Sequence, residues 1–459
     1  MLDGLKQQLE AKFQFRLNKN QWKDIKRLLY EINKRNDTNY DTIINTLGKN
    51  TSILRANGRN KFFIIKRDLI NTRFPITSSK ETIDTKKVFL SEIRKPYPKN
   101  YKCSSPFEPE TIYIEENTKG SYLEKRLKDK FPNINIKTIT YYSNYIKSHK
   151  FSQDELKKPI IFIVKENWDF IKPCPCTKGH LSCNYWIFNL GMGCPFDCSY
   201  CFLQAYSNFP GIILPSNLDD FFNKFDDFYK KINRKIRIGT GEFCDSLALD
   251  DITGYSPQLI DFFRNKNVYF EFKTKSDNIK NILSSNPSSN IIISWSLNPQ
   301  TIVEEEEKCS VSLEKRLIAA KKVQDKGFSV AFHFDPIIHT PGWENAYKNV
   351  VNMLYQRIQP PFMWISLGTL RGPRQLKNVA ERRFEQSKIF YGELLIGKDK
   401  KLRYPKFIRK QIYKNMVKWI RKHDTKTPIY LCMEDEDIWS AMDKPFTSSK
   451  EIEKYLVNP

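Results

Sequence analysis

The stretch YWIFNLGMGCPFDCSYC, residues 185–201, consists of a short apolar run followed by a loop with three cysteines. Aromatic and β-branched residues in the run favour a β-strand, and the Gly and Pro that follow indicate its end. Cys194, Cys198 and Cys201 therefore lie on one short loop after a predicted strand. This strand is the first of a regular series.

Five similar runs follow the first, and helical stretches separate them. The runs are RKIRI (234–238), VYFEF (268–272), NIIISWS (290–296), FSVAFHF (328–334) and FMWISLG (362–368). Strands that alternate with helices form parallel sheets, and runs that are apolar on both faces indicate a sheet covered on both sides. We therefore predict an α/β fold with a partial (β/α)6 barrel, and a doubly wound sheet is the alternative.

The chain outside these strands is divided by composition. Residues 1–90 show apolar positions at three- and four-residue spacing, which predicts a basic, helical N-terminal extension. Residues 91–184 form a small mixed α/β segment, 185–370 the barrel, and 371–459 a basic α/β segment that could contact nucleic acid. Within the barrel, the apolar stripe of residues 313–326 predicts a helix that ends at Gly327.

The charge is strongly positive. The chain of 459 residues has 76 Lys and Arg against 52 Asp and Glu, a net charge of +24. Such an excess suits a polyanionic partner such as nucleic acid, whereas the alternative is a general enrichment in lysine without any partner. The acidic run at 304–307 is interpreted as a solvated loop. No apolar run is long enough to span a membrane and the N-terminus lacks a signal peptide, so we expect a cytoplasmic protein.

The three cysteines of the 194–201 loop follow the spacing C-x3-C-x2-C. Three thiolates on one short loop can hold a 4Fe–4S cluster and leave one iron without a protein ligand, which suits catalysis. The alternative is a zinc ion or closed cluster completed by a distant Cys or His.

The remaining cysteines and histidines carry weaker signals. Cys174, Cys176 and Cys183 with His180 could form a second metal site, but their spacing matches no strong ligand pattern and a packed loop is the alternative. His333 falls within a predicted strand and is interpreted as a satisfied core residue. The lone cysteines are interpreted as ordinary small buried residues; they are Cys103, Cys309 and Cys432.

The cysteine loop resembles the cluster-binding motif of the radical S-adenosylmethionine (SAM) superfamily. The resemblance implies a partial barrel, a 4Fe–4S cluster, and S-adenosyl-L-methionine that is cleaved to a 5′-deoxyadenosyl radical. After RKIRI, Gly239-Thr240-Gly241-Glu242 resembles the Gly-Gly-Glu stretch that receives the SAM amino group. By similarity, Lys275 and Ser296 at two further strand ends match SAM-contacting residues.

Within the superfamily, residues 105–445 resemble the spore photoproduct lyase family. The matching stretches are Cys-Ser-Tyr-Cys-Phe-Leu-Gln at 198–204, Lys-Thr-Lys at 273–275, Ser-Leu-Asn-Pro at 296–299 and Pro-Ile-Ile-His at 336–339. The resemblance implies that Cys244 returns a hydrogen atom to the product radical, although alignment on the next Asp places Glu242 near that position. Family members carry Tyr after the third cluster Cys, and here Phe202 has no hydroxyl. Tyr200, inside the motif, remains as a catalytic candidate.

The resemblance implies an enzyme that repairs a cross-linked thymine photoproduct in DNA, supplied with electrons by a donor such as ferredoxin or flavodoxin. Two alternatives remain: a radical SAM reaction on another nucleic acid or a protein, and a non-catalytic iron–sulfur protein that binds nucleic acid. The residues expected to hold phosphates are Arg371, Arg374, Arg382, Arg383, Arg403 and Lys406.

Overall fold

The computed structural model describes residues 4–457 and divides into two compact units. The barrel unit consists of Tyr97–Leu370 with Arg409–Pro459. The N-terminal unit consists of Met1–Pro96 with Arg371–Ile408. The chain segment 371–459 is thus shared between the two units.

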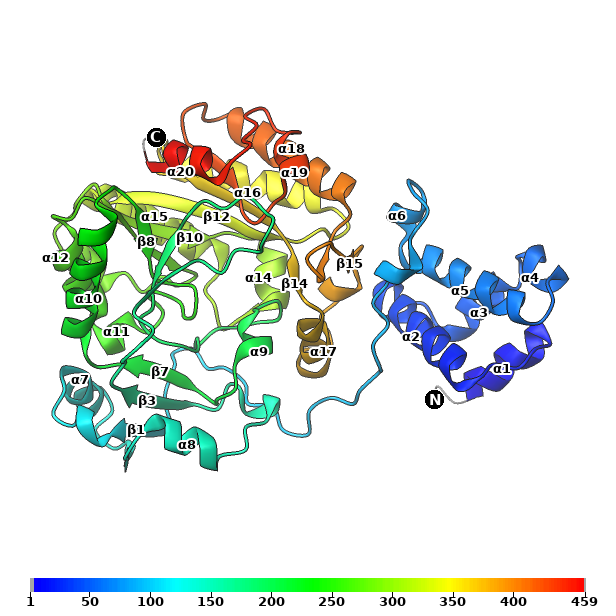
Figure 1. Cartoon of the computed structure of the whole chain (residues 1–459), viewed down its shortest axis with the longest axis horizontal. Helices are drawn as coiled ribbons and strands as arrows, with labels where there is room; N and C mark the ends of the chain where they lie inside the picture. The colour runs from blue at the N-terminus through cyan, green and yellow to red at the C-terminus, as the bar shows by residue number, and fades with distance from the viewer. Residues whose placement is uncertain (1–3, 458–459) are drawn as a thin grey trace. The chain divides into compact units, whose positions relative to one another are not determined.

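A curved sheet with the strand order β17-β13-β12-β10-β9-β8-β5-β4 forms the centre of the barrel unit (Figure 1). The six predicted strands are β5 (Trp186–Phe188), β8 (Arg237–Gly239), β9 (Tyr269–Thr274), β10 (Ile291–Ser296), β12 (Ser329–Ile337) and β13 (Ile365–Thr369). They are mutually parallel and adjacent in chain order, which confirms the predicted α/β half-barrel. The edge strands β17 (Ile429–Leu431), parallel, and β4 (Ile171–Pro173), antiparallel, complete it.

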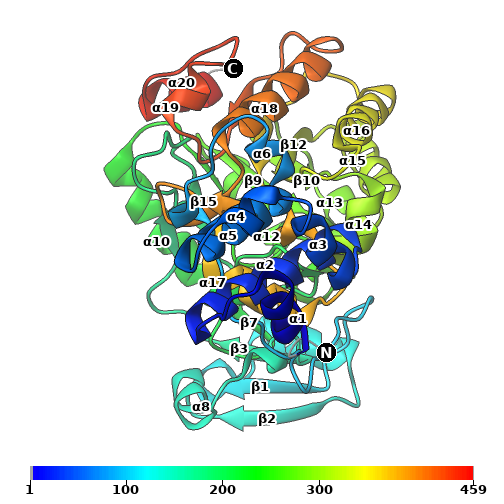
Figure 2. The same cartoon turned by 90° about the vertical axis from the view of Figure 1, so that its right-hand side faces the viewer.

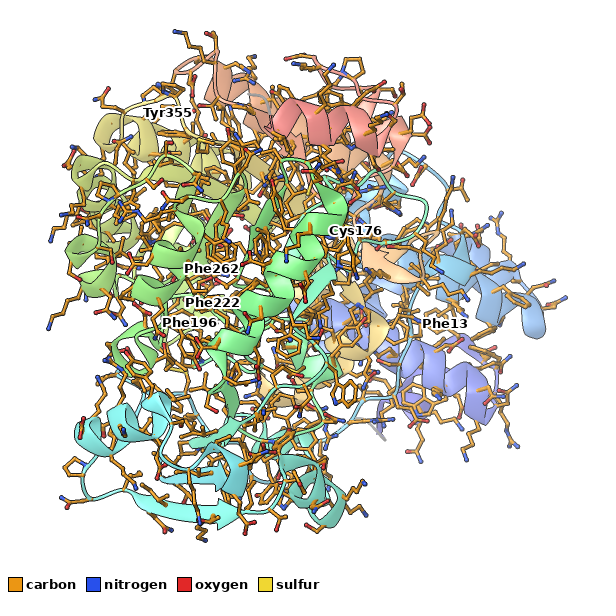
Figure 3. The ribbon with its side chains drawn as sticks, turned by 60° about the vertical axis from the view of Figure 1, so that its left-hand side comes forward. Phe13, Cys176, Phe196, Phe222, Phe262 and Tyr355 are labelled. Atoms are coloured by element: carbon orange, nitrogen blue, oxygen red, sulfur yellow. A yellow bond between two sulfur atoms is a disulfide. The ribbon has the colours of Figure 1, made fainter. Side chains whose placement is uncertain are left out.

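Helices lie along the outer side of these strands (Figure 1). They are α10 (Leu218–Ile232), α12 (Tyr255–Phe263), α13 (Lys280–Ser284), α15 (Leu313–Lys326), α16 (Trp343–Arg357) and α18 (Lys406–Arg421). Two further short helices, α11 (Asp250–Thr253) and α14 (Gln300–Glu306), follow β8 and β10 along the chain. Every residue of β10 is buried, as a strand covered on both faces requires. Helix α15 ends at Gly327, which has a left-handed φ of 104°, as predicted. Between α10 and α12, the rings of Phe222 and Phe262 stack with centroids 4.2 Å apart (Figure 3).

A second, smaller sheet is formed by three strands that precede the barrel in sequence and one strand that follows the cysteine loop. Its order is β2-β1-β3-β7, formed by Asn135–Ile139, Thr111–Glu115, Ile160–Val164 and Ile212–Pro215 (Figure 2). The helices α7 (Tyr122–Lys130) and α8 (Tyr142–Ser148) connect these strands. Strand β7 comes from the segment directly after the cysteine loop, so this sheet anchors one end of that loop. Short α19 (Glu436–Trp439) and α20 (Ser449–Val457) end the unit.

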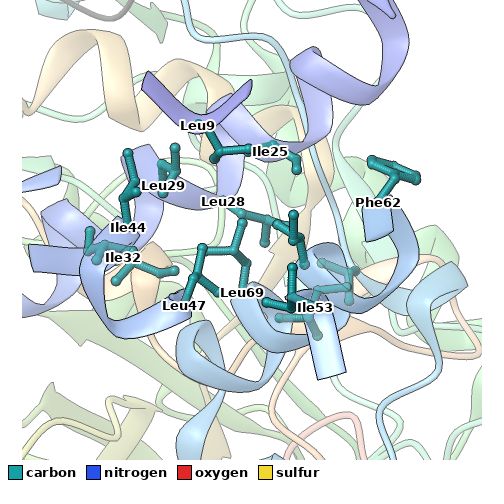
Figure 4. Close-up of a cluster of buried hydrophobic side chains, with 14 of the residues drawn as sticks. Leu9, Ile25, Leu28, Leu29, Ile32, Ile44, Leu47, Ile53, Phe62 and Leu69 are labelled. Atoms are coloured by element: carbon teal, nitrogen blue, oxygen red, sulfur yellow. The ribbon is translucent and has the colours of Figure 1, made fainter. Parts of the chain in front are cut away.

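The N-terminal unit begins with six helices, which confirms the predicted helical character of residues 1–90. They are α1 (Gly4–Phe13), α2 (Lys19–Asn36), α3 (Tyr40–Leu47), α4 (Thr51–Arg55), α5 (Arg59–Arg73) and α6 (Pro75–Ser78). Their apolar faces meet in one core, where Leu28, Ile44 and Leu69 are fully buried (Figure 4). Helix α2 starts with a capping box between Asn18 and Gln21, which fixes its first turn.

A buried ion network joins residues 371–408 to these helices. The Glu31 carboxylate of α2 accepts hydrogen bonds from Arg27 (2.7 Å), Arg73 (2.6 Å) and Lys377 (2.5 Å) of α17 (Arg374–Arg383). Burial alone would raise the pKa of Glu31, but these cations hold it below its ordinary value. The Glu393 carboxylate accepts hydrogen bonds from both the N–H and the hydroxyl of Thr77 in α6. Strands β14 (Arg371–Pro373), β15 (Leu395–Ile396) and β16 (Lys401–Arg403) complete the unit.

One expectation about the lone cysteines is wrong. Cys103 and Cys309, 206 positions apart, form a disulfide with their Cα atoms 6.1 Å apart. The pairing brings a loop before β1 to the turn after β11 (Glu307–Lys308), and no local pattern encodes such a contact. Among residues 4–457, no helix combines the length and apolar character needed to cross a membrane.

Candidate active site

The cysteine loop is held in place from three sides. Strand β6 (Asp197–Cys198) pairs with β11, so that Cys198 lies opposite Glu307. The Gln204 amide donates to the carbonyls of Cys198 (2.7 Å) and Ser199 (3.1 Å). Lys157 donates to the carbonyl of Cys194 (2.8 Å). Gln204, which belongs to the sequence motif, therefore stabilises the cysteine loop through its amide. The contact of Lys157 with the loop could not be predicted from the sequence.

The three thiols fit the ligand set of a cluster. The Cys198 thiol is close enough to those of Cys194 and Cys201 to interact with them electrostatically. Burial raises the pKa of Cys194 to about 12 and also raises the pKa of the other two, so the free thiols are protonated. A bound metal centre supplies the positive charge that stabilises thiolates. The three thiols are therefore suited to a site in which they lose their protons when the metal cluster binds.

Within residues 4–457, no three His, Cys, Asp or Glu side chains converge on a point that would hold one metal ion. A 4Fe–4S cluster binds each cysteine through a different iron atom, so its ligands surround a volume rather than a point. The loop at 174–185 brings Cys174, Cys176 and Cys183 near one another, and Cys176 accepts from the Ser182 hydroxyl at 3.5 Å. The contacts of this loop are those of a packed turn.

The interpretation of the acidic run as a solvated loop is wrong, because residues 304–306 lie in the helix α14 and the last two glutamates of the run are buried. Glu306 and Glu307 are only 2% and 1% exposed. The Glu307 carboxylate accepts from the Tyr200 hydroxyl, from Asn298 (2.8 Å) and from Arg316 (2.5 Å). Burial would raise the pKa of Glu307, but Arg316 and Lys275 outweigh it and lower this pKa. Glu306 and Glu307, which we name the clamp, hold the cluster loop because they bond to Ser199 and Tyr200, 107 positions earlier in the chain.

Arg316 completes this clamp. Its guanidinium is fully buried and also donates to the carbonyls of Ser296 (2.9 Å) and Val311 (3.0 Å). The Ser199 hydroxyl and N–H both bond to Glu306. The cluster loop, the end of β10 and α15 are thereby joined through charged side chains that sequence analysis did not select. No local sequence pattern identifies these residues, because their burial and their partners follow from the packing of the chain.

The candidate SAM-binding residues lie at the carboxyl ends of three adjacent strands. Gly239 ends β8, and a side chain there would clash with the Glu271 carbonyl. Gly241 has a φ of 95°, which favours glycine, and a Cβ on it would lie 2.8 Å from the Lys273 carbonyl. The Glu242 side chain lies 3.6 Å from the Lys273 ammonium. Both glycines therefore allow this turn to pack closely against the backbone of β9.

Asp245 links this turn to the next strand. Its carboxylate accepts from the N–H groups of Leu247 (3.0 Å) and Lys275 (2.7 Å) and from the Thr274 hydroxyl (2.6 Å). The Lys275 ammonium lies 5.8 Å from the centre of the Tyr200 ring, and Cys198 and Glu307 help to raise its pKa against the effect of burial. Ser296, buried, ends β10 beside β9. Lys275 thus faces the cluster loop.

Cys244 lies on the same turn, near the cluster loop. Its partly buried thiol interacts electrostatically with Cys194 and Asp245, and burial raises its pKa. The Phe202 ring lies 6.3 Å from that of Phe243 and 5.8 Å from that of Tyr206, centre to centre. Cys244 therefore lies beside one of the cluster ligands.

His333 is a satisfied core residue, as predicted. Its ring nitrogens lie 2.6 Å from the Ser366 hydroxyl and 2.7 Å from Glu271, inside the sheet. The expectation about phosphate-holding arginines is wrong for two residues. Arg383 and Arg403 are buried, and Arg403 pairs with Asp399 at 2.8 Å, so neither lies on an exposed surface.

The chain is similar to several known spore photoproduct lyases. A spore photoproduct lyase from Bacillus subtilis (strain 168) is 24% identical over 259 residues, covering 54% of this chain and 74% of the relative. One from Geobacillus sp. (strain Y412MC61) is 24% identical over 300 residues, 62% of this chain and 85% of the relative. A solved spore photoproduct lyase complexed with dinucleoside spore photoproduct superposes with a TM-score of 0.62, at 21% identity, over 71% of this chain and 99% of its own.

The family model described as spore photoproduct lyase matches residues 107–434, which include the three cysteines of the cluster loop, the turn with Cys244 and all six strands of the half-barrel. The match covers well over half of the chain, and the superfamily and family predicted from its motifs are confirmed. This chain belongs to the spore photoproduct lyase family.

Proposed function

We propose that this chain is a radical SAM lyase that repairs a cross-linked thymine photoproduct in DNA. The observation that carries the proposal is the placement of three thiols on one anchored loop beside the Cys244 turn, within a chain of this family. When bound and reduced, a 4Fe–4S cluster with S-adenosyl-L-methionine supplies a 5′-deoxyadenosyl radical, which abstracts hydrogen from the thymine pair.

The residues of this chain have separable roles in the proposal. Cys194, Cys198 and Cys201 would hold the cluster and leave one iron open. Gly239, Gly241 and Glu242 would receive the SAM amino group, while Lys275 and Ser296 would bind its carboxylate and ribose. Their common position at the carboxyl ends of β8, β9 and β10 supports this assignment, because parallel strands of a barrel place their sites at that edge.

After the bond between the bases breaks, one thymine is left as a radical that needs a hydrogen atom. Cys244 would donate it by breaking its S–H bond, and the sulfur radical left on Cys244 would regain a hydrogen atom from 5′-deoxyadenosine. The thiol lies on the turn after β8 and beside one of the cluster ligands. The Tyr200 hydroxyl, inside the cluster loop, donates to Glu307. An electron donor of the ferredoxin or flavodoxin type belongs to the proposal as well, since the cluster must be reduced before it can act. A cytoplasmic location is also part of the proposal.

The decisive experiment offers an oligonucleotide with the spore photoproduct to the anaerobically reconstituted chain with SAM and a reductant. We expect restored thymines, and SAM should perturb the EPR signal of the reduced cluster through its open iron. A reduced cluster whose signal is indifferent to SAM would exclude the enzyme. SAM cleavage without repair would favour a different substrate. The specific reason to consider this outcome is that Phe202 has no hydroxyl where family members carry Tyr.

Replacing Cys244 tests the hydrogen-donor role. We expect Cys244→Ala to cleave SAM as the parent does, yet to convert the product radical into by-products instead of thymine, because the nearest thiol is gone. Chromatography of the products measures the ratio. Cys432→Ala, which removes a thiol beyond β17 at the far edge of the sheet, is the matched control and should repair cleanly. Clean repair by Cys244→Ala would remove the role of that residue.

A further inference from the structure

The positive charge of this chain is concentrated in one unit. The N-terminal unit contains 32 Lys and Arg against 14 Asp and Glu, a net charge of +18 in less than a third of the chain. The barrel unit contains 44 against 38, a net charge of +6. A general enrichment in lysine would load both units alike. Because the barrel unit has so little net charge, the excess of positive charge in the N-terminal unit is not explained by a general enrichment in lysine.

Part of this charge surrounds an open groove. The groove has a volume of about 820 Å³ and is lined by side chains that include Arg16, Asn20, Lys23, Phe63 and Leu90. Arg16 is exposed, and Phe63 is 52% exposed although it is a large apolar residue. Cations, a side-chain amide and an exposed aromatic ring along one groove are the groups with which proteins bind nucleic-acid backbones and bases.

The segment after α6 continues this surface. Lys23 forms an ion pair with Glu92 at 2.9 Å, which places the segment along the groove. Lys86, Lys87, Arg94 and Lys95 are exposed on it.

Helix α17 borders the same segment. The Arg374 guanidinium lies 5.9 Å from the Phe89 ring centre, and Arg382 donates to the Lys95 carbonyl at 2.9 Å. The basic face, as we name it, consists of Arg16, Lys86, Lys87, Arg94, Lys95 and Arg374.

We propose that the basic face binds the phosphate backbone of duplex DNA, independently of its sequence. Residues 1–96 lie outside the part of the chain that matches the family model, so this face is largely an addition to the lyase itself. That the basic face holds duplex with a photoproduct for repair rests on the proposed function. That the basic face binds duplex DNA does not. Neutralising phosphates releases counterions, which makes such binding strongly dependent on salt.

The test compares two triple variants of the full chain. One carries Arg16→Gln, Lys87→Gln and Arg94→Gln on the basic face. The matched control carries Lys322→Gln, Lys326→Gln and Lys348→Gln, three lysines on the outer helices α15 and α16 of the barrel unit. Fluorescence anisotropy with undamaged duplex, over a range of salt concentrations, needs neither cluster nor SAM. Thermal unfolding shows whether each variant is folded. If the basic-face triple does not fold, the single substitution Arg94→Gln is tested in its place.

We expect the basic-face triple to reduce the log–log salt slope by about 1 for each phosphate that is no longer neutralised, about 3 in all, and the control to match the parent. Equal weakening in both triples, or in neither, would overturn the proposal. In repair assays, kcat/KM on a long duplex should fall only in the basic-face triple, whereas a dinucleoside photoproduct should be repaired equally by all. If the parent chain repairs nothing, the proposed function fails. The difference in DNA affinity between the two triple variants then decides this inference by itself.

Discussion

Replacing Cys198 with alanine should abolish both the iron centre and SAM cleavage. Cys198 is the buried member of the three cysteines, and its position is fixed by pairing with Glu307 and by Gln204. Loss of its thiolate leaves one cluster iron without a protein ligand in addition to the open one. After anaerobic reconstitution we expect about four iron atoms per parent chain and far fewer in Cys198→Ala. Cys194→Ala and Cys201→Ala should behave alike.

The neighbouring thiol supplies the matched control for this result. Cys244 lies beside Cys194 but is assigned to hydrogen donation, so Cys244→Ala should retain the full iron content. If instead Cys244→Ala loses iron and Cys198→Ala keeps it, the cluster is bound by a different set of residues. The iron assay distinguishes these cases without any substrate.

The second large effect is expected from Glu307→Ala. This substitution removes the carboxylate from Arg316, which is fully buried and cannot turn to solvent for a replacement partner. Breaking a buried ion pair on one side costs about 3–5 kcal/mol, because an uncompensated charge remains in the interior. Chemical denaturation should show a loss of stability in this range. Iron binding should weaken too, since the Tyr200 hydroxyl inside the cluster loop loses its acceptor, although the backbone pairing of Cys198 with position 307 remains.

Glu305→Ala is the control for this experiment. Glu305 belongs to the same acidic run but is exposed, and its removal should change stability by no more than about 0.5 kcal/mol. Glu307→Gln should fall between the two, because an amide oxygen can still accept from Asn298 but no longer balances the charge of Arg316. A Glu307→Ala variant as stable as the parent would show that the clamp contributes nothing to the fold.

The amino-acid sequence by itself determined the half-barrel, the cluster motif and the family. Each depends on information that is local along the chain. The six strands follow from short apolar runs separated by helical stretches, and the cluster loop follows from the spacing of Cys194, Cys198 and Cys201. The helix that ends at Gly327 and the core position of His333 were predictable for the same reason.

Only the tertiary structure decided which distant residues meet. Glu307 is one of four consecutive glutamates, and nothing local distinguishes it from its exposed neighbour Glu305 until Arg316 and Tyr200 are brought to it. Cys103 finds Cys309 across 206 positions. Lys377 joins the N-terminal helices through Glu31, 346 positions earlier in the chain. Burial changes the chemistry of a charged or sulfur-containing side chain, and burial is a property of the packed chain, not of its local pattern.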